Sequence, residues 1–288
     1  MGVQRGKGKV LADAGASEHL DAAVDHPGGH AGDRHLDRRN LDAGALHPHG
    51  VHEPGGLEDH QPGLLDPDTR FGDPVLDNTL LGPCFQHPLR LGADLVLYSG
   101  TKYLAGFSDM LAGVALAADP DLIHRLRGAR ALFGNILQPD ECWMLDSRLP
   151  TVTLRMNRQS KNAQRIAEKL VGHPRVARVF YPSLFDDPSQ KAIRDRQCRF
   201  PGAIISLVLQ DGRAAAFEFL RRLRIVRNAV SLGGVESLAC HPRTTTHSEM
   251  SEAELEAAGI LDSLVRISVG TEDWRDLLAD FEEALGRE

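Results

Sequence analysis

LGADLVLYSGTKYLAGFSDMLAG, residues 91–113, is the stretch that decides the fold. Its apolar run from Asp94 to Ser99 predicts a buried strand, and Lys102 follows three residues after the end of that run. Ligands of open α/β sheets bind at the carboxyl ends of strands. Gly100 and Gly106 on either side of the lysine let the backbone come close to a planar ligand. The stretch therefore predicts a lysine held at a ligand site of an α/β fold.

Lys102 and the two hydroxyls beside it have two interpretations. The Lys102 amine can attack an aldehyde if burial or a nearby positive charge lowers its pKa, and the hydroxyls of Ser99 and Thr101 can donate hydrogen bonds to a phosphate. The alternative is a solvated lysine after a strand, with hydroxyls that bond only to the local backbone. The residues alone leave these two interpretations open.

The rest of the chain after residue 74 has the pattern of an α/β protein. Further strands are expected at residues 176–181, 203–209 and 264–269. Two helices are expected to face the core through Ala163, Ile166, Ala167 and Leu170, and through Phe217, Leu220 and Leu223. The final helix is expected to be capped by Thr271, with an apolar stripe of Trp274, Leu277, Leu278, Phe281 and Leu285.

Pro150 interrupts a helical pattern that runs from residue 140 to residue 172, which predicts a domain boundary near Leu149. Residues 1–73 differ from the rest: the first aromatic residue is Phe71, and eight of the thirteen histidines lie in the first sixty positions. This segment shows no period of either a strand or a helix, so loop or disorder is expected. Its histidine spacings are irregular, so no metal site is predicted.

Composition narrows the class of partner. The net charge is −7, and the lysines and arginines form no basic cluster. This distribution argues against nucleic acid or an anionic membrane as a partner and favours a small-molecule substrate. No apolar run approaches the length of a membrane span, and residues 1–10 lack the apolar core of a secretory signal, so a cytoplasmic protein is expected. The four cysteines are widely spaced and are expected to be reduced thiols.

The lysine segment resembles the lysine motif of the Cys/Met-metabolism pyridoxal-phosphate (PLP) enzymes, a family that includes cystathionine γ-synthase, cystathionine γ-lyase and methionine γ-lyase. The resemblance extends over about residues 74–286. Its further landmarks, in chain order, are DNT (77–79), HPLRLGAD (87–94), NA (162–163), HP (173–174), YP (181–182), SLGGVESL (231–238), TH (246–247) and LVRISVG (264–270).

The resemblance implies an aspartate-aminotransferase-like α/β fold (fold type I). Residues 74–149 would be the remnant of a large cofactor domain with a mostly parallel sheet, and residues 150–288 a smaller C-terminal α/β domain. The family is expected to form homotetramers. Because the usual interface would be incomplete here, exposed apolar surface and poor solubility are expected.

The resemblance also implies a cofactor site. Lys102 would hold PLP through its amine, and Asp77 would face the pyridinium nitrogen and keep it protonated. Ser99 and Thr101 would bind the phosphate. The alternative for Asp77 is a turn residue at the end of a strand.

For the substrate, the resemblance assigns Arg266 to the α-carboxylate, which a guanidinium can hold through two parallel hydrogen bonds. Ser231 would line the same site. The alternatives are a salt-bridge partner for Arg266 and a simple turn residue for Ser231. Just before Ser231, members that handle cystathionine have an acidic residue, whereas this chain has Val230. That difference favours methionine, homocysteine or an acyl-homoserine, although residues 233–237 resemble the synthases and cystathionine lyases more closely.

The implied function is γ-elimination or γ-replacement at Cγ of a sulfur amino acid, as in transsulfuration. Only 76 residues precede Asp77, and they lack the family's glycine-rich phosphate loop and its tyrosines, since the first tyrosine is Tyr98. We therefore expect residues 1–73 to be a non-native, out-of-frame reading joined to a family C-terminal portion; a natural N-terminal arm is the alternative. A truncated chain that only binds PLP or intact subunits remains the second hypothesis.

Overall fold

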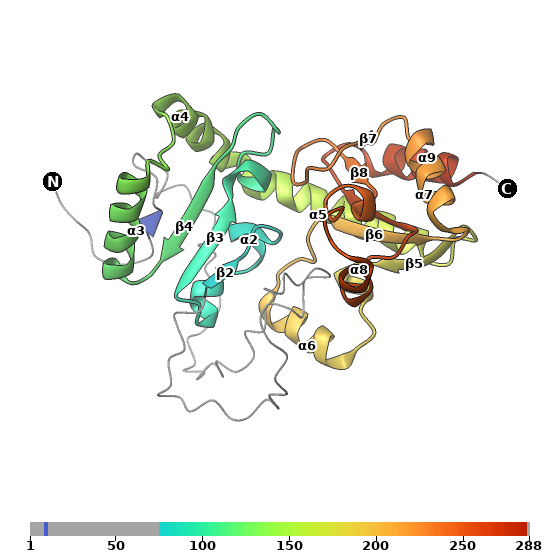
Figure 1. The fold of residues 1–288 in the computed structure, drawn as a ribbon, viewed down its shortest axis with the longest axis horizontal. Coiled ribbons are helices and arrows are strands. Elements are labelled where there is room, and N and C mark those ends of the chain that lie inside the picture. Colours follow the sequence, from blue (N-terminus) through green and yellow to red (C-terminus); the bar gives the residue numbers. More distant parts are fainter. Residues whose placement is uncertain (1–8, 11–74, 287–288) are drawn as a thin grey trace.

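The computed structural model describes residues 9–10 and 75–286. Residues 9–10 form a short strand, where loop or disorder was expected for residues 1–73. The other expectations for residues 1–73 lie outside the described residues. The described chain forms two sheets, and the long helix α5 (Val152–Leu170) runs from one to the other (Figure 1). The first sheet carries the lysine segment, and the second contains the strand of Arg266. Helix α5 is therefore in a position to contact both.

The first sheet has the strand order β1-β4-β3-β2. Strand β3 (Leu95–Ser99) pairs in parallel with β2 (Val75–Asp77) and antiparallel with β4 (Gly113–Ala117), which pairs antiparallel with β1 (Lys9–Val10). A mostly parallel sheet was expected, but β2 and β3 are the only parallel pair among the described strands of this sheet. Their parallel alignment places Asp77 and Ser99 at the same edge.

Helices surround this sheet and lead to α5. They are the short α2 (Gly82–Phe85), α3 (Pro120–Phe133) and α4 (Pro139–Arg148). A 3₁₀ turn, Leu149–Thr151, separates α4 from α5, so the interruption predicted at Pro150 is present. Proline lacks the N–H that a continuous helix would need there. The assignment of a domain boundary to this point stays a prediction.

The second sheet has the order β5-β6-β9-β8-β7, with every pair antiparallel except β7 and β8. The three strands predicted for this region are confirmed to within one residue at each end: β5 (Val176–Phe180), β6 (Ile204–Leu209) and β9 (Leu264–Ser268). The edge strands β7 (Arg227–Asn228) and β8 (Leu238–Cys240) are too short to give a periodic signal. Helices α6 (Pro188–Gln197) and α8 (Glu252–Ala257) lie in the connections.

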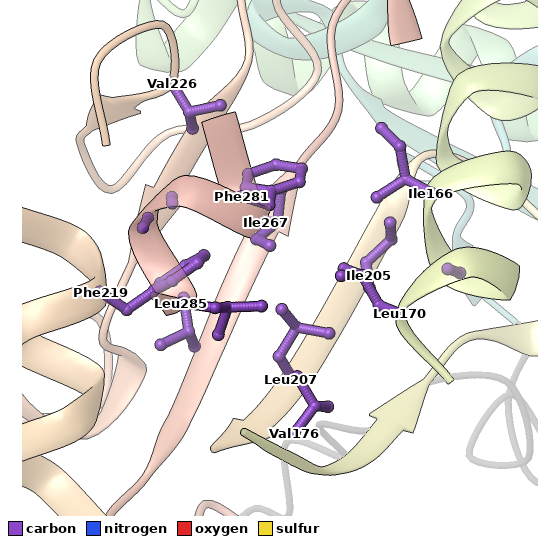
Figure 2. Close-up of a cluster of buried hydrophobic side chains, with 14 of the residues drawn as sticks. Ile166, Leu170, Val176, Ile205, Leu207, Phe219, Val226, Ile267, Phe281 and Leu285 are labelled. Atoms are coloured by element: carbon purple, nitrogen blue, oxygen red, sulfur yellow. The ribbon is translucent and has the colours of Figure 1, made fainter. Parts of the chain in front are cut away.

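Three helices, α5, α7 (Gly212–Arg222) and α9 (Trp274–Leu285), form one hydrophobic core with this sheet (Figure 2). Ile166 and Leu170 of α5 are buried there as predicted. Phe217 of α7 was expected to face this core, but it is 44% exposed and packs edge-on against His241. Phe219 occupies the core instead, because the buried face of α7 is centred on Ala216 and each residue turns the helix by about 100°.

Helix α9 has the predicted stripe, with Leu277, Phe281 and Leu285 buried. The predicted cap was wrong: Asp273, not Thr271, caps the helix by accepting a hydrogen bond from the backbone N–H of Arg275. An acidic cap also suits the positive end of the helix.

Within residues 75–286 and the short β1 strand, no helix is both long enough and apolar enough to cross a bilayer.

Candidate functional site

The ends of β2 and β3 are joined through Thr79. The Oδ1 atom of Asp77 accepts hydrogen bonds from the backbone N–H of Thr79 at 2.9 Å and from its hydroxyl at 2.5 Å. The hydroxyl oxygen of Thr79 in turn accepts from the N–H of Ser99 at 2.7 Å. Asp77 therefore forms the strand-end turn that was its alternative interpretation, and the same turn holds its exposed carboxylate beside Ser99 at the ligand edge.

Lys102 lies in a tight turn, Gly100–Leu104, directly after β3. Its backbone angles, φ −88° and ψ −122°, are not helical, so the chain kinks at the lysine. Thr101 fixes the start of the turn: its hydroxyl accepts from the N–H of Ala112 at 3.0 Å, and its N–H donates to the Ala112 carbonyl at 3.2 Å. The hydroxyl thus bonds to local backbone, as the alternative interpretation of Thr101 expected.

The structure brings Lys102, Ser231 and Arg266 together from distant parts of the sequence. The Lys102 Nζ donates to the Ser231 hydroxyl at 3.3 Å. The Arg266 guanidinium donates to the main-chain carbonyls of Val230 and Ser231. Partial burial lowers the pKa of Lys102, and the positive charge of Arg266 lowers it further. A larger fraction of the amine is therefore unprotonated and nucleophilic at neutral pH than in an ordinary lysine.

The loop of Ser231 packs directly on the lysine turn. Gly233, at φ +82°, is so close that a Cβ there would lie 2.9 Å from the Tyr103 nitrogen and 3.1 Å from the Lys102 Cβ. The N–H of Gly233 donates to the Ser268 hydroxyl at the end of β9. Only glycine fits both the conformation and the space, so Gly233 allows the loop of Ser231 to pack against the lysine turn.

Two cavities adjoin these residues. A cavity of about 940 Å³ is lined by Asp77 and Arg266 together with residues of β5, α6 and β6. A second, of about 450 Å³, lies beside Ser231 and is lined on its other sides by Phe107, Arg227 and Glu236 among others. Asp77 and Arg266 thus border a space large enough for a small-molecule ligand, and Ser231 borders the smaller cavity. Lys102, Ser99 and Thr101 are not among the lining residues of these two cavities. No group of three potential metal-ligating side chains occurs in the part of the chain that the structure describes.

A row of buried polar residues lies on α5; sequence reasoning missed Arg155 and Gln159 and named Asn162 only as a landmark of the resemblance. Arg155 donates to the carbonyls of Tyr103 and Leu104, Gln159 donates to Gly234 O at 2.7 Å, and Asn162 donates to Gly270 O at 3.1 Å. The signal was available, because residues spaced by four and three lie on one helical face, and most other buried residues of this helix are apolar. Polar groups on a buried helix face need partners, and here the partners are the loops of the candidate site.

The chain is similar to proteins of one known family. Residues 74–286 match the family described as Cys/Met metabolism PLP-dependent enzyme. An L-methionine gamma-lyase of Pseudomonas deceptionensis is 46% identical over 213 residues, which are 73% of this chain and 53% of the relative. A cystathionine gamma-synthase of Mycobacterium tuberculosis is 42% identical over 212 residues, 74% of this chain and 54% of the relative. The chain spans about half the length of the curated relatives it matches.

Solved structures agree. A cystathionine gamma synthase from Xanthomonas oryzae, solved with aminoacrylate and cysteine, is 41% identical and has a TM-score of 0.71 over 73% of this chain and 54% of that one. A cystathionine gamma lyase from Micromonospora echinospora has a TM-score of 0.70 at 40% identity, over 74% of this chain and 56% of that one. The predicted fold class, part of an aspartate-aminotransferase-like α/β fold, is confirmed. The chain belongs to the Cys/Met metabolism PLP-dependent enzyme family.

Proposed function

We propose that this chain binds PLP through Lys102 and acts on the Cγ substituent of a sulfur amino acid, by γ-elimination or γ-replacement. The observation that carries the proposal is the amine of Lys102, half-buried at the end of β3, bonded to Ser231 and under the influence of Arg266. A lysine with a lowered pKa is suited to attack an aldehyde. The relatives bearing the names methionine gamma-lyase and cystathionine gamma-synthase support the reaction class.

The donor set of the site fits the cofactor. Lys102 would hold the aldehyde carbon, Asp77 would pair with the pyridinium nitrogen, and Ser99 and Thr101 would bind the phosphate. When bound, PLP supplies an electron sink for the electrons of a broken bond at the substrate Cα. Within this chain, the turn through Thr79 holds the Asp77 carboxylate at the ligand edge. The Lys102 amine would move protons between substrate carbons.

Arg266 and Ser231 would orient the substrate. The guanidinium of Arg266 is anchored by carbonyls of the loop that carries Ser231, so the two residues are positioned as one unit. A guanidinium held in this way can grip an α-carboxylate and fix which bond at Cα is broken.

Covalent cofactor binding is the direct test. Purified protein is mixed with PLP, scanned for absorbance near the visible edge, and then reduced with borohydride and digested for mass spectrometry. We expect a band that grows with added cofactor and a reduced cofactor on the peptide that contains Lys102. A protein without the band, or with label spread over exposed lysines, would overturn the proposal.

Val230 supports a proposal for the substrate class. Its side chain is 52% exposed beside Ser231, and it offers only apolar contact to the distal end of a substrate. Methionine, homocysteine or an acyl-homoserine suits it better than cystathionine, whose distal amine calls for a carboxylate. The Val230 main chain also supports Arg266, so a side-chain change there alters the distal end of the site while keeping that bond.

A substitution tests this preference. Val230→Glu should raise kcat/KM for cystathionine relative to methionine by about tenfold, because a charge-assisted hydrogen bond contributes about 1.5 kcal/mol. Val230→Gln is the matched control, since it has a similar size and no charge. The measurement is release of ammonia and 2-oxo acid from each substrate. An unchanged ratio in the Glu variant would remove the basis for this substrate choice.

Cofactor binding without turnover is the second candidate. It is favoured by Thr101, whose hydroxyl is already engaged with Ala112. A chain of this kind would show the absorbance band and the label on Lys102 but would release no ammonia from methionine, homocysteine or cystathionine.

A further inference from the structure

A buried guanidinium lies directly behind the lysine turn. Arg155, in the first turn of α5, is 8% exposed. Its Nη1 donates to the Tyr103 carbonyl at 2.6 Å, and its Nη2 donates to the Leu104 carbonyl at 2.9 Å and to the Arg148 carbonyl at 3.3 Å. Its Nε donates to the Thr151 hydroxyl at 3.1 Å. The charge is therefore held almost entirely by main-chain oxygens.

The absence of a carboxylate makes this arginine unusual. Among residues 75–286, no Asp or Glu oxygen lies within ion-pair distance of Arg155. Burial lowers its pKa to about 10; the nearby Cys84 opposes this shift and Arg148 adds to it. Arg155 thus stays cationic at neutral pH. Burying an unpaired charge is costly, so a residue of this kind needs a reason beyond packing.

The lysine turn supplies that reason. Because the backbone kinks at Lys102, the turn does not continue into a helix that would bond the carbonyls of Tyr103 and Leu104. The chain closes instead with a bond from the Gly106 N–H to the Lys102 carbonyl at 2.7 Å. The two carbonyls that immediately follow the lysine depend on the guanidinium of Arg155 as their donor.

The contact between Arg155 and the lysine turn requires glycine at position 106. Gly106 lies at φ +76°, and a Cβ on it would come within 2.2 Å of the Arg155 Nη1. Any side chain at position 106 would therefore displace the guanidinium. The glycine that bonds the lysine carbonyl and the arginine that bonds the next two carbonyls form one tightly packed pair.

We propose that Arg155 is the positioning residue of Lys102, and that it fixes the turn so that the amine stays half-buried beside Ser231 and Arg266. This inference rests on the proposed function, since the position of the amine matters for its reaction with a cofactor. Arg155 touches neither the amine nor the cavity beside Ser231; it acts through the main chain of residues 103–106. Without it, the turn relaxes toward solvent and the amine loses both influences that lower its pKa.

The test measures the amine itself, on the full-length protein after any bound cofactor has been removed with hydroxylamine. Trace acetic anhydride labels all lysines, and mass spectrometry gives the rate at Lys102 relative to exposed Lys161 on α5 across a range of pH. Arg155→Met should lower the relative rate at Lys102 by about tenfold near pH 8 and move its midpoint upward, because one pKa unit changes the free-amine fraction tenfold. Arg266, the charge that acts on the amine, is unchanged.

Three variants separate positioning from charge and from general loss of structure. Gly106→Ala keeps every charge and displaces the guanidinium, so it should give the same direction of change. Arg155→Lys keeps the charge but lacks the planar guanidinium that donates to two carbonyls. The labelling rate at Lys102 in this variant should therefore be only about threefold higher than in Arg155→Met. Arg158→Met is the matched control: Arg158 is exposed on the same helix and donates to the carbonyls of Thr271 and Glu272, away from the turn. It should stay within about twofold of the parent.

The outcomes are distinguishable. A fall in Lys102 labelling in both Arg155→Met and Gly106→Ala, with normal far-ultraviolet circular dichroism, supports the inference. A fall in Arg155→Met with a normal rate in Gly106→Ala would mean a charge effect and would overturn positioning, as would parental rates in both. If Arg155→Met does not fold, Gly106→Ala and Arg155→Lys decide. Cofactor binding by the parent, measured separately with PLP, tests the proposed function and not this inference.

Discussion

Lys102→Ala is expected to abolish covalent attachment of PLP and to reduce any ammonia release from sulfur amino acids by at least about 10³-fold, the scale typical of losing a nucleophile. Alanine removes the only amine that the turn after β3 directs toward Ser231 and Arg266. The cofactor would then be held by non-covalent contacts alone. The absorbance band near the visible edge should be absent, and borohydride should leave no stable adduct.

Lys161→Ala is the matched control. Lys161 is exposed on α5, so its loss should leave both the band and the adduct at parental levels. Equal thermal unfolding of the two variants would show that the difference belongs to the amine. Persistence of the band in Lys102→Ala would move the cofactor to another lysine and would remove the basis of the site described above.

Asp280→Ala is expected to destabilise the protein by about 3–5 kcal/mol. Asp280 is 6% exposed on α9, and its carboxylate accepts hydrogen bonds from three consecutive backbone N–H groups, those of Arg224 at 2.8 Å and of Ile225 and Val226 at 3.1 Å. The alanine variant would leave these donors without their acceptor. A carboxylate in the second half of a helix is unfavourable for the helix dipole, so its partners in the 224–226 segment account for its presence.

Chemical denaturation measures the loss. Glu282→Ala on the same helix is exposed and should change the free energy of unfolding by less than about 0.5 kcal/mol. Asp280→Asn should fall between the two, because an amide offers one acceptor oxygen instead of two. A free energy of unfolding for Asp280→Ala within about 1 kcal/mol of the parent would show that the three N–H groups find other acceptors.

The sequence was most informative where one local pattern determines the structure. Four strands were predicted to within one residue at each end, because short apolar runs between turn residues have few alternatives. The stripe of α9 was equally clear, since five apolar residues share one face. The lysine segment identified the fold class through its resemblance to the family's lysine motif, and the kink of the chain at Lys102 was not predicted.

Features that depend on packing between distant segments were harder to predict. Phe217 was assigned to the core because it shares a helical face with Leu220 and Leu223, yet the face of α7 that meets the sheet is centred on smaller Ala216. Thr271 and Asp273 are both capable caps, and the choice depends on where the chain leaves β9. The helical spacing of Arg155 could have marked it as a polar residue on the buried face of α5, but its partners could not be predicted, because the Tyr103 and Leu104 carbonyls lie more than fifty residues earlier. The roles of Asp77, Ser99, Thr101 and the other site residues remain predictions.

Helix α5 fixes the separation between two parts of the candidate site. Arg155 bonds the lysine turn and Asn162 bonds the backbone just after the strand of Arg266, seven residues further along the helix. At a rise of 1.5 Å per residue, the two contacts are about 10 Å apart along the helix axis. A rigid helix that contacts both parts transmits displacement from one to the other. Mutations in α5 that do not line the candidate site should therefore change the distance between the Lys102 amine and the Arg266 guanidinium.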